Sequence, residues 1–400
     1  MRLFHPRPQR NALRTLFRTI RSHWKIVLCI ILLMVLEAWV HSRSYTITPP
    51  AIPLDQPFYT GCQTPPRNTS ARANAVLVML ARNSEVEGAV ASVKSVQKQF
   101  NDAFGYPWVF LNDKAWSEKF KEKFEVIPKE MWTYPSWIDQ NRAQQSMHDM
   151  QNRHIQYGGK ESYHHMCRFQ SGFFFDHPAL TPYQYYWRVE PNIRFTCAIT
   201  YDPFHEMAHH AKKYAYTIAL WERGATVPSL FRKLSDYKAS HQLPTSPLWT
   251  AMLDPSWMPW PLRRALSVLP NRDSGGDLWN MCHFWSNFEI ADLGFFRSVA
   301  YRDLFAFLDR DGGFYYERWG DAAVHSLAAA MLLQPHEIHR FADWGYVHDG
   351  LQVCPEKGGE GEEEEGGCRC ECKKGARVVE PVSRILSRKR RALSSVISHS

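Results

Sequence analysis

Three segments of this chain place carboxylates among aromatic side chains. The segments are Tyr185–Asn192, Trp285–Ile290 and Gly312–Asp321, and the first two contain Glu190 and Glu289. Aromatic rings pack against the faces of sugars, while carboxylates bond hydroxyls or stabilise positive charge at an anomeric carbon. The pattern therefore indicates a site that holds a sugar and acts on its anomeric carbon.

Glu190 is followed by Pro191, which restricts the chain directly after the carboxylate. Residues 184–189 read as a strand, so the carboxylate is presented at a strand end. A carboxylate beside a diphosphate can share a divalent ion with the phosphate oxygens, because all of these are hard oxygen ligands. A purely structural Glu-Pro strand end fits the same pattern, and both interpretations stay open.

Glu289 stands between Phe288 and Ile290, in a stretch where polar groups alternate with large aromatic residues. Such neighbours predict that the carboxylate is partly removed from water. Burying a carboxylate without a partner is costly, which favours a paired or functional role. The alternative is a structural salt bridge.

Glu317, in the third segment, stands next to an arginine and a tryptophan, a combination suited to hydroxyl hydrogen bonds and ring stacking. His325 follows on an apolar helix predicted over 322–333, where a histidine is more often a hydrogen-bonded core residue than a ligand. His348 falls on a predicted loop, and a loop histidine near carboxylates can bind a metal ion.

The elements that must position these residues follow the pattern of an α/β fold. Residues 75–80 and 106–111 are apolar runs of strand length. Between them, a capping-box pattern at Ser84–Glu87 precedes apolar residues at helical spacing up to Phe100. Strand, amphipathic helix and strand predict a βαβ unit, and hence an α/β domain with a largely parallel sheet.

Open α/β sheets bind ligands beyond the carboxyl ends of their strands. Arg82 and Asn83 follow the first predicted strand, and Glu190 follows the strand over 184–189. We therefore expect Arg82 and Glu190 to lie at one edge of the sheet. A solvated loop position remains an equal alternative for Arg82.

The distribution of charge along the chain indicates which kind of partner the protein binds. The chain has 400 residues, 44% of them hydrophobic, which is enough for a substantial core. Its net charge is +8, but arginines and lysines crowd the two ends and the middle is more balanced. This distribution argues against nucleic acid as a partner.

A basic N-terminal segment precedes an apolar run that begins at Ile26 and continues to Val40, interrupted by Glu37. A small-residue cleavage site is missing, so an uncleaved signal anchor is predicted, with 1–23 cytosolic, 24–41 transmembrane and the later residues lumenal. Glu37 is costly within a bilayer unless it reaches the interface. A buried or peripheral helix is the alternative.

The rest of the chain divides by composition. Residues 42–72 are rich in proline, threonine and serine and predict a stem. Residues 73–355 form the predicted catalytic domain, with a loop-rich insertion at about 232–276. Residues 356–400 begin with a glycine and glutamate tract and end in basic residues, which predicts a low-complexity, disordered tail.

A lumenal location permits disulfides. Four cysteines of the predicted domain could form two bridges in any of three pairings; they are Cys167, Cys197, Cys282 and Cys354. The C-terminal cluster of Cys368, Cys370 and Cys372 lacks the usual Cys-x-x-Cys spacing of zinc sites. Disulfides are therefore predicted for this cluster too.

Taken together, these segments resemble the fungal α-1,2-mannosyltransferase family, glycosyltransferase family 15. The resemblance spans residues 73–355 apart from the insertion, and it is carried by long motifs in one order. These motifs are Tyr106–Asp113, Tyr134–Asp139, Tyr157–Gly159, Glu161–Phe169, Tyr186–Pro191, Cys282–Asp292 and Gly312–Asp321.

The resemblance implies a type II Golgi membrane protein with a GT-A-like domain. It implies retaining transfer of mannose from GDP-mannose, with Mn²⁺, to mannose residues of N- or O-linked glycans on glycoproteins. The matching positions imply that Glu289 is the nucleophile and that Glu190 and His348 bind the metal ion, with Glu190 also at the diphosphate. They further imply that Tyr163 lies near donor and acceptor, and that Arg82 and Tyr157 lie at the nucleotide.

Ala198, Asn192 and Val347 depart from the family pattern, since acidic residues or a histidine are usual there. None of these departures removes a residue with an implied role. Two alternatives remain open: a mannosylphosphate transferase of the same family, and a lectin-like or assembly subunit without turnover. Glu289 could act either as a covalent nucleophile or as an electrostatic stabiliser of an oxocarbenium-like centre.

Overall fold

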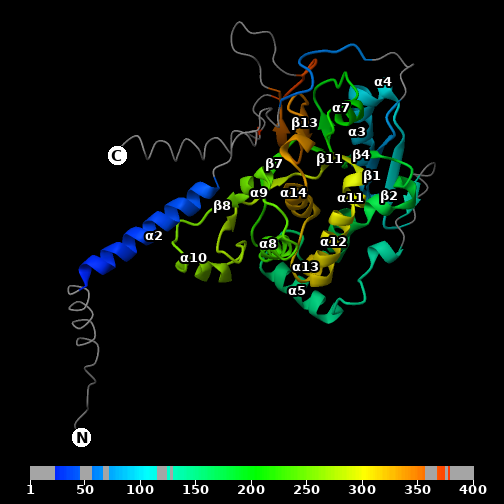
Figure 1. The fold of residues 1–400 in the computed structure, drawn as a ribbon. Coiled ribbons are helices and arrows are strands. Elements are labelled where there is room, and N and C mark those ends of the chain that lie inside the picture. Colours follow the sequence, from blue (N-terminus) through cyan, green and yellow to red (C-terminus); the bar gives the residue numbers. More distant parts are fainter. Residues whose placement is uncertain are drawn as a thin grey trace.

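A seven-stranded sheet forms the centre of the computed structural model, with helices on both of its faces (Figure 1). The structure describes residues 23–45, 56–65, 72–114, 124–126, 129–355, 367–373 and 377–378. In spatial order the strands are β12 (Ile338–Arg340), β6 (Tyr214–Tyr216), β11 (Phe288–Asp292), β4 (Tyr185–Val189), β1 (Ala75–Leu80), β2 (Trp108–Asn112) and β3 (Phe124–Val126).

The sheet is mostly parallel, as predicted. β1 pairs in parallel with β2 and β4, β2 with β3, and β6 with β12, whereas β11 runs antiparallel to β4 and β6. The predicted βαβ unit is confirmed as β1, α3 (Val86–Val96) and β2. The predicted capping box at Ser84 is wrong by two residues, because the backbone N–H of Arg82 donates to Glu85 Oε2 at 2.9 Å.

Side chains alternate between two cores along the strands, as the period of a pleated strand requires. On one face, Leu77 of β1, Trp187 of β4 and Ile290 of β11 pack with the α3 side of the domain. On the other face, Val78 and Tyr186 pack against a larger set of helices. The strands are thus buried on both sides, which explains the continuous apolar runs in the sequence.

The helices of the larger core include α6 (Glu161–Gly172) and α14 (Asp321–Leu332), which confirms the apolar helix predicted at 322–333. The other described helices of at least four residues are α5 (Gln140–Asn152), α7 (Pro203–His209), α8 (Leu230–Ser240), α9 (Pro247–Ala251), α10 (Leu262–Ala265), α11 (Leu293–Arg297), α12 (Val299–Asp311) and α13 (Gly313–Tyr316). A π-helical turn, Gln97–Asn101, continues α3 into α4 (Asp102–Phe104).

Three smaller sheets complete the domain. One contains β15 (Arg377–Val378), β14 (Leu351–Val353), β13 (Tyr346–His348) and β5 (Arg194–Phe195). The others pair β10 (Cys282–Phe284) with β7 (Ala219–Trp221), and β8 (Leu253–Asp254) with β9 (Leu278–Trp279). The predicted insertion at 232–276 therefore contains short elements, namely most of α8 together with α9, β8 and α10.

The disulfides predicted for the C-terminal cysteine cluster are confirmed, but the bridges predicted among the cysteines within the domain are not. The disulfides are Cys62–Cys368, Cys197–Cys370 and Cys354–Cys372, whereas Cys167 and Cys282 are buried and take part in none of these bridges. The expected pairing within the domain is wrong because the C-terminal cluster supplies a partner for each bridge. The expectation of a disordered tail fails for residues 367–373, which these bridges attach to the domain; residues 356–366, 374–376 and 379–400 lie outside the described residues.

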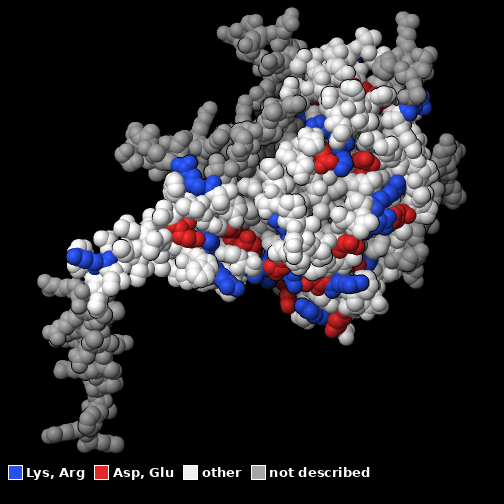
Figure 2. Space-filling view, in the orientation of Figure 1, with Lys and Arg blue, Asp and Glu red and all other residues white. Residues whose placement is uncertain are grey.

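Helix α2 (Trp24–Ser44) projects from the domain (Figure 1). It is long and apolar enough to cross a membrane, and it matches the predicted anchor segment. In Figure 2 the projecting part of the surface is mostly uncharged, whereas both signs of charge are interspersed over the folded body.

Candidate active site

The candidate site lies at the edge of the sheet where β1, β2 and β4 end. Arg82 follows β1, Asp113 follows β2 and Glu190 follows β4. Because β11 is antiparallel to β4, the residues that precede it, Ser286 and Asn287, lie at this edge too. The parallel pairing of β1 with β4 confirms the expectation that Arg82 and Glu190 share one sheet edge.

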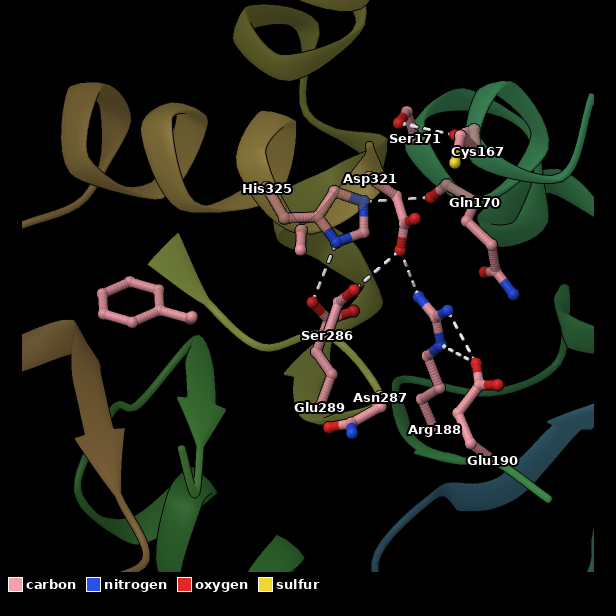
Figure 3. Close-up of polar contacts among 12 residues, drawn as sticks. Cys167, Gln170, Ser171, Arg188, Glu190, Ser286, Asn287, Glu289, Asp321 and His325 are labelled. Carbon is pink, nitrogen blue, oxygen red and sulfur yellow. Dashed lines mark hydrogen bonds and ion pairs between the residues drawn. The ribbon is translucent and has the colours of Figure 1, made fainter. Parts of the chain in front are cut away.

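An arginine joins the rim carboxylate to a buried one (Figure 3). Arg188 donates from Nε and Nη2 to Glu190 Oε1, at 2.9 and 2.7 Å, and from Nη1 to Asp321 Oδ2 at 2.5 Å. Ser286 Oγ donates to the same Asp321 oxygen at 2.7 Å. Both Arg188 bonds to Glu190 use Oε1, and the Glu190 side chain is 25% exposed, so this carboxylate remains accessible to a ligand.

The charges of this network are set by the pair at its centre. Burial alone would raise the pKa of the Asp321 carboxyl, but Arg188, His325 and the hydrogen bond from Ser286 together outweigh burial and hold that pKa below its usual range. Burial opposes the charge of Arg188, while Asp321 and Glu190 raise its pKa above the ordinary arginine value. Arg188 and Asp321 therefore stay ionised near neutral pH as a buried ion pair.

Glu289 lies beside Arg188 in the sheet register but has different surroundings. It is completely buried, and its Oε2 accepts a hydrogen bond from Tyr214 Oη at 2.5 Å and contacts His325 Nδ1 at 2.8 Å. Its Oε1 has no hydrogen-bond partner. The carboxylate points to the α6 and α14 side, opposite to its neighbours Phe288 and Ile290.

His325 and Glu289 share one proton. His325 Nε2 lies 2.9 Å from the carbonyl oxygen of Gln170, which can only accept, so Nε2 carries hydrogen. The remaining proton lies between Nδ1 and Glu289 Oε2, giving either an imidazolium–carboxylate pair or a neutral histidine with a protonated glutamate. Burial raises the pKa of Glu289, and His325 partly opposes this effect. His325 is thus the hydrogen-bonded core histidine that the pattern favours, and Glu289 is paired.

Two stacked tyrosines lie near Asp321. The rings of Tyr157 and Tyr163 are 4.6 Å apart, and Tyr157 is 42% exposed. Arg318 Nη1 donates to Tyr163 Oη at 3.2 Å, and its guanidinium also lies 3.5 Å from Glu222 Oε1. Burial raises the pKa of Tyr163 well above the ordinary value, with smaller contributions from neighbours that include Asp321. Tyr163 therefore remains a neutral hydroxyl.

Arg82 is held at the rim by a local ion pair. Its Nη2 lies 2.7 Å from Glu85 Oε1, and 59% of its side chain is exposed. The hydrogen bond to Glu85 raises the pKa of Arg82, with smaller contributions from Asp113 and Glu190. A bound anion would have to share this guanidinium with Glu85.

His348 ends strand β13, so its prediction as a loop residue is wrong. Its side chain is 14% exposed, its Nε2 lies 3.6 Å from Asp349 Oδ2, and its ring centre lies 5.2 Å from that of Trp285. His348 Nδ1 is buried without a hydrogen-bond partner, as are both amide atoms of Asn287. In the described parts of the chain, no three histidine, cysteine or acidic residues converge as a metal site.

Glu317, singled out from the sequence, serves the local structure. Its Oε2 accepts bonds from Trp319 Nε1 at 2.6 Å and from the Ser229 backbone N–H at 3.2 Å. Burial raises its pKa. The carboxylate is thus engaged within the larger core rather than at the rim.

Several residues of the site were not predicted from the sequence. Arg188 stands two positions before Glu190, a spacing that puts both side chains on one face of a strand, so it could have been found. Tyr214 and Glu222 have no such signal.

His164 connects two parts of the site. It bonds the carbonyl oxygens of Phe314 and Gly158 at 2.6 and 2.9 Å, and thereby attaches the loop beside Tyr157 to α13.

Comparison with known proteins gives relatives along most of the chain. A family model described as glycolipid 2-alpha-mannosyltransferase matches residues 59–380. The O-glycoside alpha-1,2-mannosyltransferase homolog 4 of Schizosaccharomyces pombe is 40% identical, and the alignment covers 87% of this chain and 85% of that protein. The glycolipid 2-alpha-mannosyltransferase of Saccharomyces cerevisiae is 44% identical over 72% of this chain and 63% of its own length.

Solved structures give the same result. Core-mannan synthase A (CmsA/Ktr4) from Aspergillus fumigatus, in its Mn/GDP-form, superposes with a TM-score of 0.67 at 35% identity, covering 85% of this chain and 90% of the other. The mannosyltransferase Ktr4p of S. cerevisiae in complex with GDP superposes with a TM-score of 0.66 at 32% identity, covering 80% and 81%.

Proposed function

Because this chain belongs to the glycolipid 2-alpha-mannosyltransferase family, we propose that it moves mannose from GDP-mannose to mannose residues of N- or O-linked glycans, in α-1,2 linkage and with retention of configuration. The chain is a glycosyltransferase with a mixed α/β fold. The proposal rests on the arrangement of two carboxylates at the edge of the central sheet. An accessible Glu190 follows β4 there, and a buried Glu289 lies on β11, which pairs with β4.

The rim would hold the diphosphate end of the donor. A relative is known in a Mn/GDP-form, and Glu190 and His348 offer donor atoms of the kinds that such an ion accepts. His348 Nδ1 is a buried nitrogen without a partner, and Glu190 has an oxygen that Arg188 does not use. These residues fit Mn²⁺, which when bound would neutralise negative charge on the departing diphosphate.

The buried pair would act on the sugar end. Glu289 has no exposed surface, and its Oε2 is bonded to Tyr214 and His325. A covalent nucleophile must reach the anomeric carbon, whereas a fixed negative charge stabilises an oxocarbenium-like centre without leaving its place. The burial therefore supports the electrostatic role over covalent attack.

The remaining residues would position the two substrates. Tyr157 has an exposed ring suited to stacking on a base or a sugar, and the neutral hydroxyl of Tyr163 can bond a sugar hydroxyl. Arg82 is close enough to Glu190 to interact electrostatically with it, which is consistent with a place near the nucleotide. The Gly312–Asp321 segment would form a wall on the acceptor side.

The cellular setting is part of the same proposal. Helix α2 would be the single span of a type II Golgi membrane protein, with the catalytic domain in the lumen and glycoproteins of the cell wall mannan as acceptors. Three disulfides support a lumenal domain, because such bridges persist in oxidising compartments.

The test is an assay of the full chain in detergent with GDP-mannose, Mn²⁺ and methyl α-mannoside. The expected result is release of GDP and a disaccharide whose linkage analysis gives α-1,2-mannose. A phosphate-containing product that resists α-mannosidase would replace this proposal with mannosylphosphate transfer. Mannoside binding without GDP release would instead indicate a lectin-like subunit.

A further inference from the structure

Helix α2 is bonded to the folded domain along the half that ends at Ser44. Glu37 Oε1 accepts from Arg263 Nη2 at 2.9 Å, and its Oε2 accepts from the backbone N–H of Trp260 at 2.9 Å. His41 Nε2 lies 2.9 Å from Asp277 Oδ1, and Tyr45 Oη donates to Asp277 Oδ2 at 2.8 Å. Arg263 belongs to α10, so this contact connects α10 to α2 (Figure 1).

The segment beside α2, residues 255–272, has an unusual surface. Six large apolar side chains of this segment are between 41% and 86% exposed. They are Trp257, Met258, Trp260, Leu262, Val268 and Leu269. Several large exposed apolar side chains in one short segment of a folded domain mark an interaction site.

The charges of the same segment all have one sign. Residues 255–272 contain Arg263, Arg264 and Arg272 and no aspartate or glutamate; Arg264 is exposed and Arg272 partly exposed, whereas Arg263 is buried and paired with Glu37. Exposed tryptophans and aliphatic side chains combined with arginines are typical of protein surfaces that lie in the headgroup layer of a bilayer.

The position of the segment along α2 matches that layer. Glu37 is seven residues before the end of the helix at Ser44, which is about 10 Å at ~1.5 Å per residue. Trp39 on α2 is 49% exposed at nearly the same level. Arg263 also neutralises Glu37, which reduces the cost of an acidic residue near the end of an apolar span.

We propose that residues 255–272 insert into the lumenal headgroup layer as a second membrane contact beside α2. The partner is the phospholipid bilayer, whose boundary between headgroups and acyl chains accepts tryptophan and leucine while its phosphates accept arginine. This inference rests on the proposed span of α2. Two attachments restrict rotation of the domain about α2 and hold it close to the membrane.

The test places a photo-crosslinking amino acid in the full chain, reconstituted in phosphatidylcholine vesicles. Trp260 and Val268 are the test positions, and exposed Trp137 is the matched control on another part of the surface. Leu33 on α2 is the positive control for the span. Mass spectrometry is expected to find lipid adducts at 260 and 268 in at least tenfold higher yield than at 137.

Each outcome decides the proposal. Adducts at 33 with none at 260 or 268 would overturn the second contact and leave the span intact. Adducts at 260 to a second copy or to another protein would overturn it in favour of a protein interface. A lack of adducts at 33 would overturn both the span and this inference.

A double variant tests the contact without a crosslinker at the tryptophans. With the crosslinker at 268, Trp257→Ser combined with Trp260→Ser is expected to lower the yield of lipid adducts about tenfold. Transfer to methyl α-mannoside in detergent should stay unchanged, which also shows that the variant is folded. An unchanged adduct yield would contradict a role for the tryptophans in the contact.

Discussion

Glu190 and Glu289 occupy paired strands of one sheet and have opposite environments. Glu190, at the rim, is partly exposed and shares Arg188 with Asp321. Glu289, one strand away, is fully buried and shares a proton with His325. A carboxylate at the rim can bind a ligand directly, whereas a buried one acts through its charge and its hydrogen bonds. Two carboxylates in different environments can thus serve two functions in one reaction.

Removing the buried charge is expected to have the largest effect. Glu289→Gln keeps the shape and the bond from Tyr214, but it removes negative charge near the proposed position of the anomeric carbon. We expect kcat to fall by about 10²–10³-fold, in the range seen when an oriented stabilising group is removed. GDP binding with Mn²⁺, measured by calorimetry, should change by less than about threefold.

The matched control for this variant is Glu317→Gln, which changes a half-buried carboxylate that bonds Trp319 and Ser229. It should retain most of its turnover. Undiminished turnover of Glu289→Gln would contradict the assignment. A thermal melt of both variants separates loss of chemistry from loss of fold.

Changing the residues of the proposed metal site is expected to weaken GDP binding, in contrast to Glu289→Gln. Glu190→Gln and His348→Ala should each weaken Mn²⁺-dependent GDP binding by about 10–100-fold, because a donor atom of the proposed metal site is lost. Without the metal, GDP binding should be nearly equal in variant and parent. Glu206→Gln on α7 is a control for a change of charge. An unchanged metal titration for either rim variant would remove that residue from the metal site.

The buried pair should make stability depend on pH in a defined direction. Burial raises the pKa of Glu289 in the folded chain above its ordinary value of 4.5. The folded state therefore holds this proton more tightly than the unfolded state. The associated stability is present below about pH 4.5 and is lost as pH rises through the folded pKa, by up to about 1.4 kcal/mol per pH unit.

Thermal melts of the parent and Glu289→Gln across this range measure the effect. The parent should lose stability relative to the variant, which cannot titrate, as pH rises above about 4.5. A stability difference that is constant with pH would show that the Glu289 proton is bound equally in both states. The Glu317→Gln variant reports the contribution of a half-buried carboxylate whose pKa burial also raises.

The smallest effect is expected at Arg82. Its guanidinium is largely exposed and already paired with Glu85, and exposed charge contacts contribute little, about 0–1 kcal/mol. Arg82→Gln should raise KM for GDP-mannose by about two- to fivefold and leave kcat unchanged. A large fall in kcat would mean that Arg82 contacts the reacting groups and not only the nucleotide.

Local sequence patterns correctly predicted much of the secondary structure that forms the sheet edge. The apolar runs and helical spacing correctly predicted β1, α3 and β2, and the Glu-Pro pair correctly marked the end of β4. These features depend on contacts between residues near in sequence, whose period is visible in the chain. Strand ends then locate Arg82 and Glu190 at one edge, because parallel strands end together.

Partners distant in sequence could not be predicted in this way. Asp321 is 133 residues from Arg188, and His325 is 36 from Glu289, so only the folded chain shows which charge is paired with which. The cysteine prediction failed for the same reason, since Cys62 and Cys368 are 306 residues apart. The contact between Glu37 and Arg263 was likewise invisible in the sequence.

The sequence by itself determined the α/β class, the candidate carboxylates and the apolar N-terminal segment, because periodicity and composition carry that information. The sequence also indicated a strand end for Glu190, before Pro191, and apolar neighbours for Glu289. Only the tertiary structure decided that the two carboxylates lie on neighbouring strands, and that Arg188 contacts one while His325 and Tyr214 contact the other. Their environments differ because β11 runs antiparallel to β4, which places its second residue beneath α14 while β4 ends in the open edge.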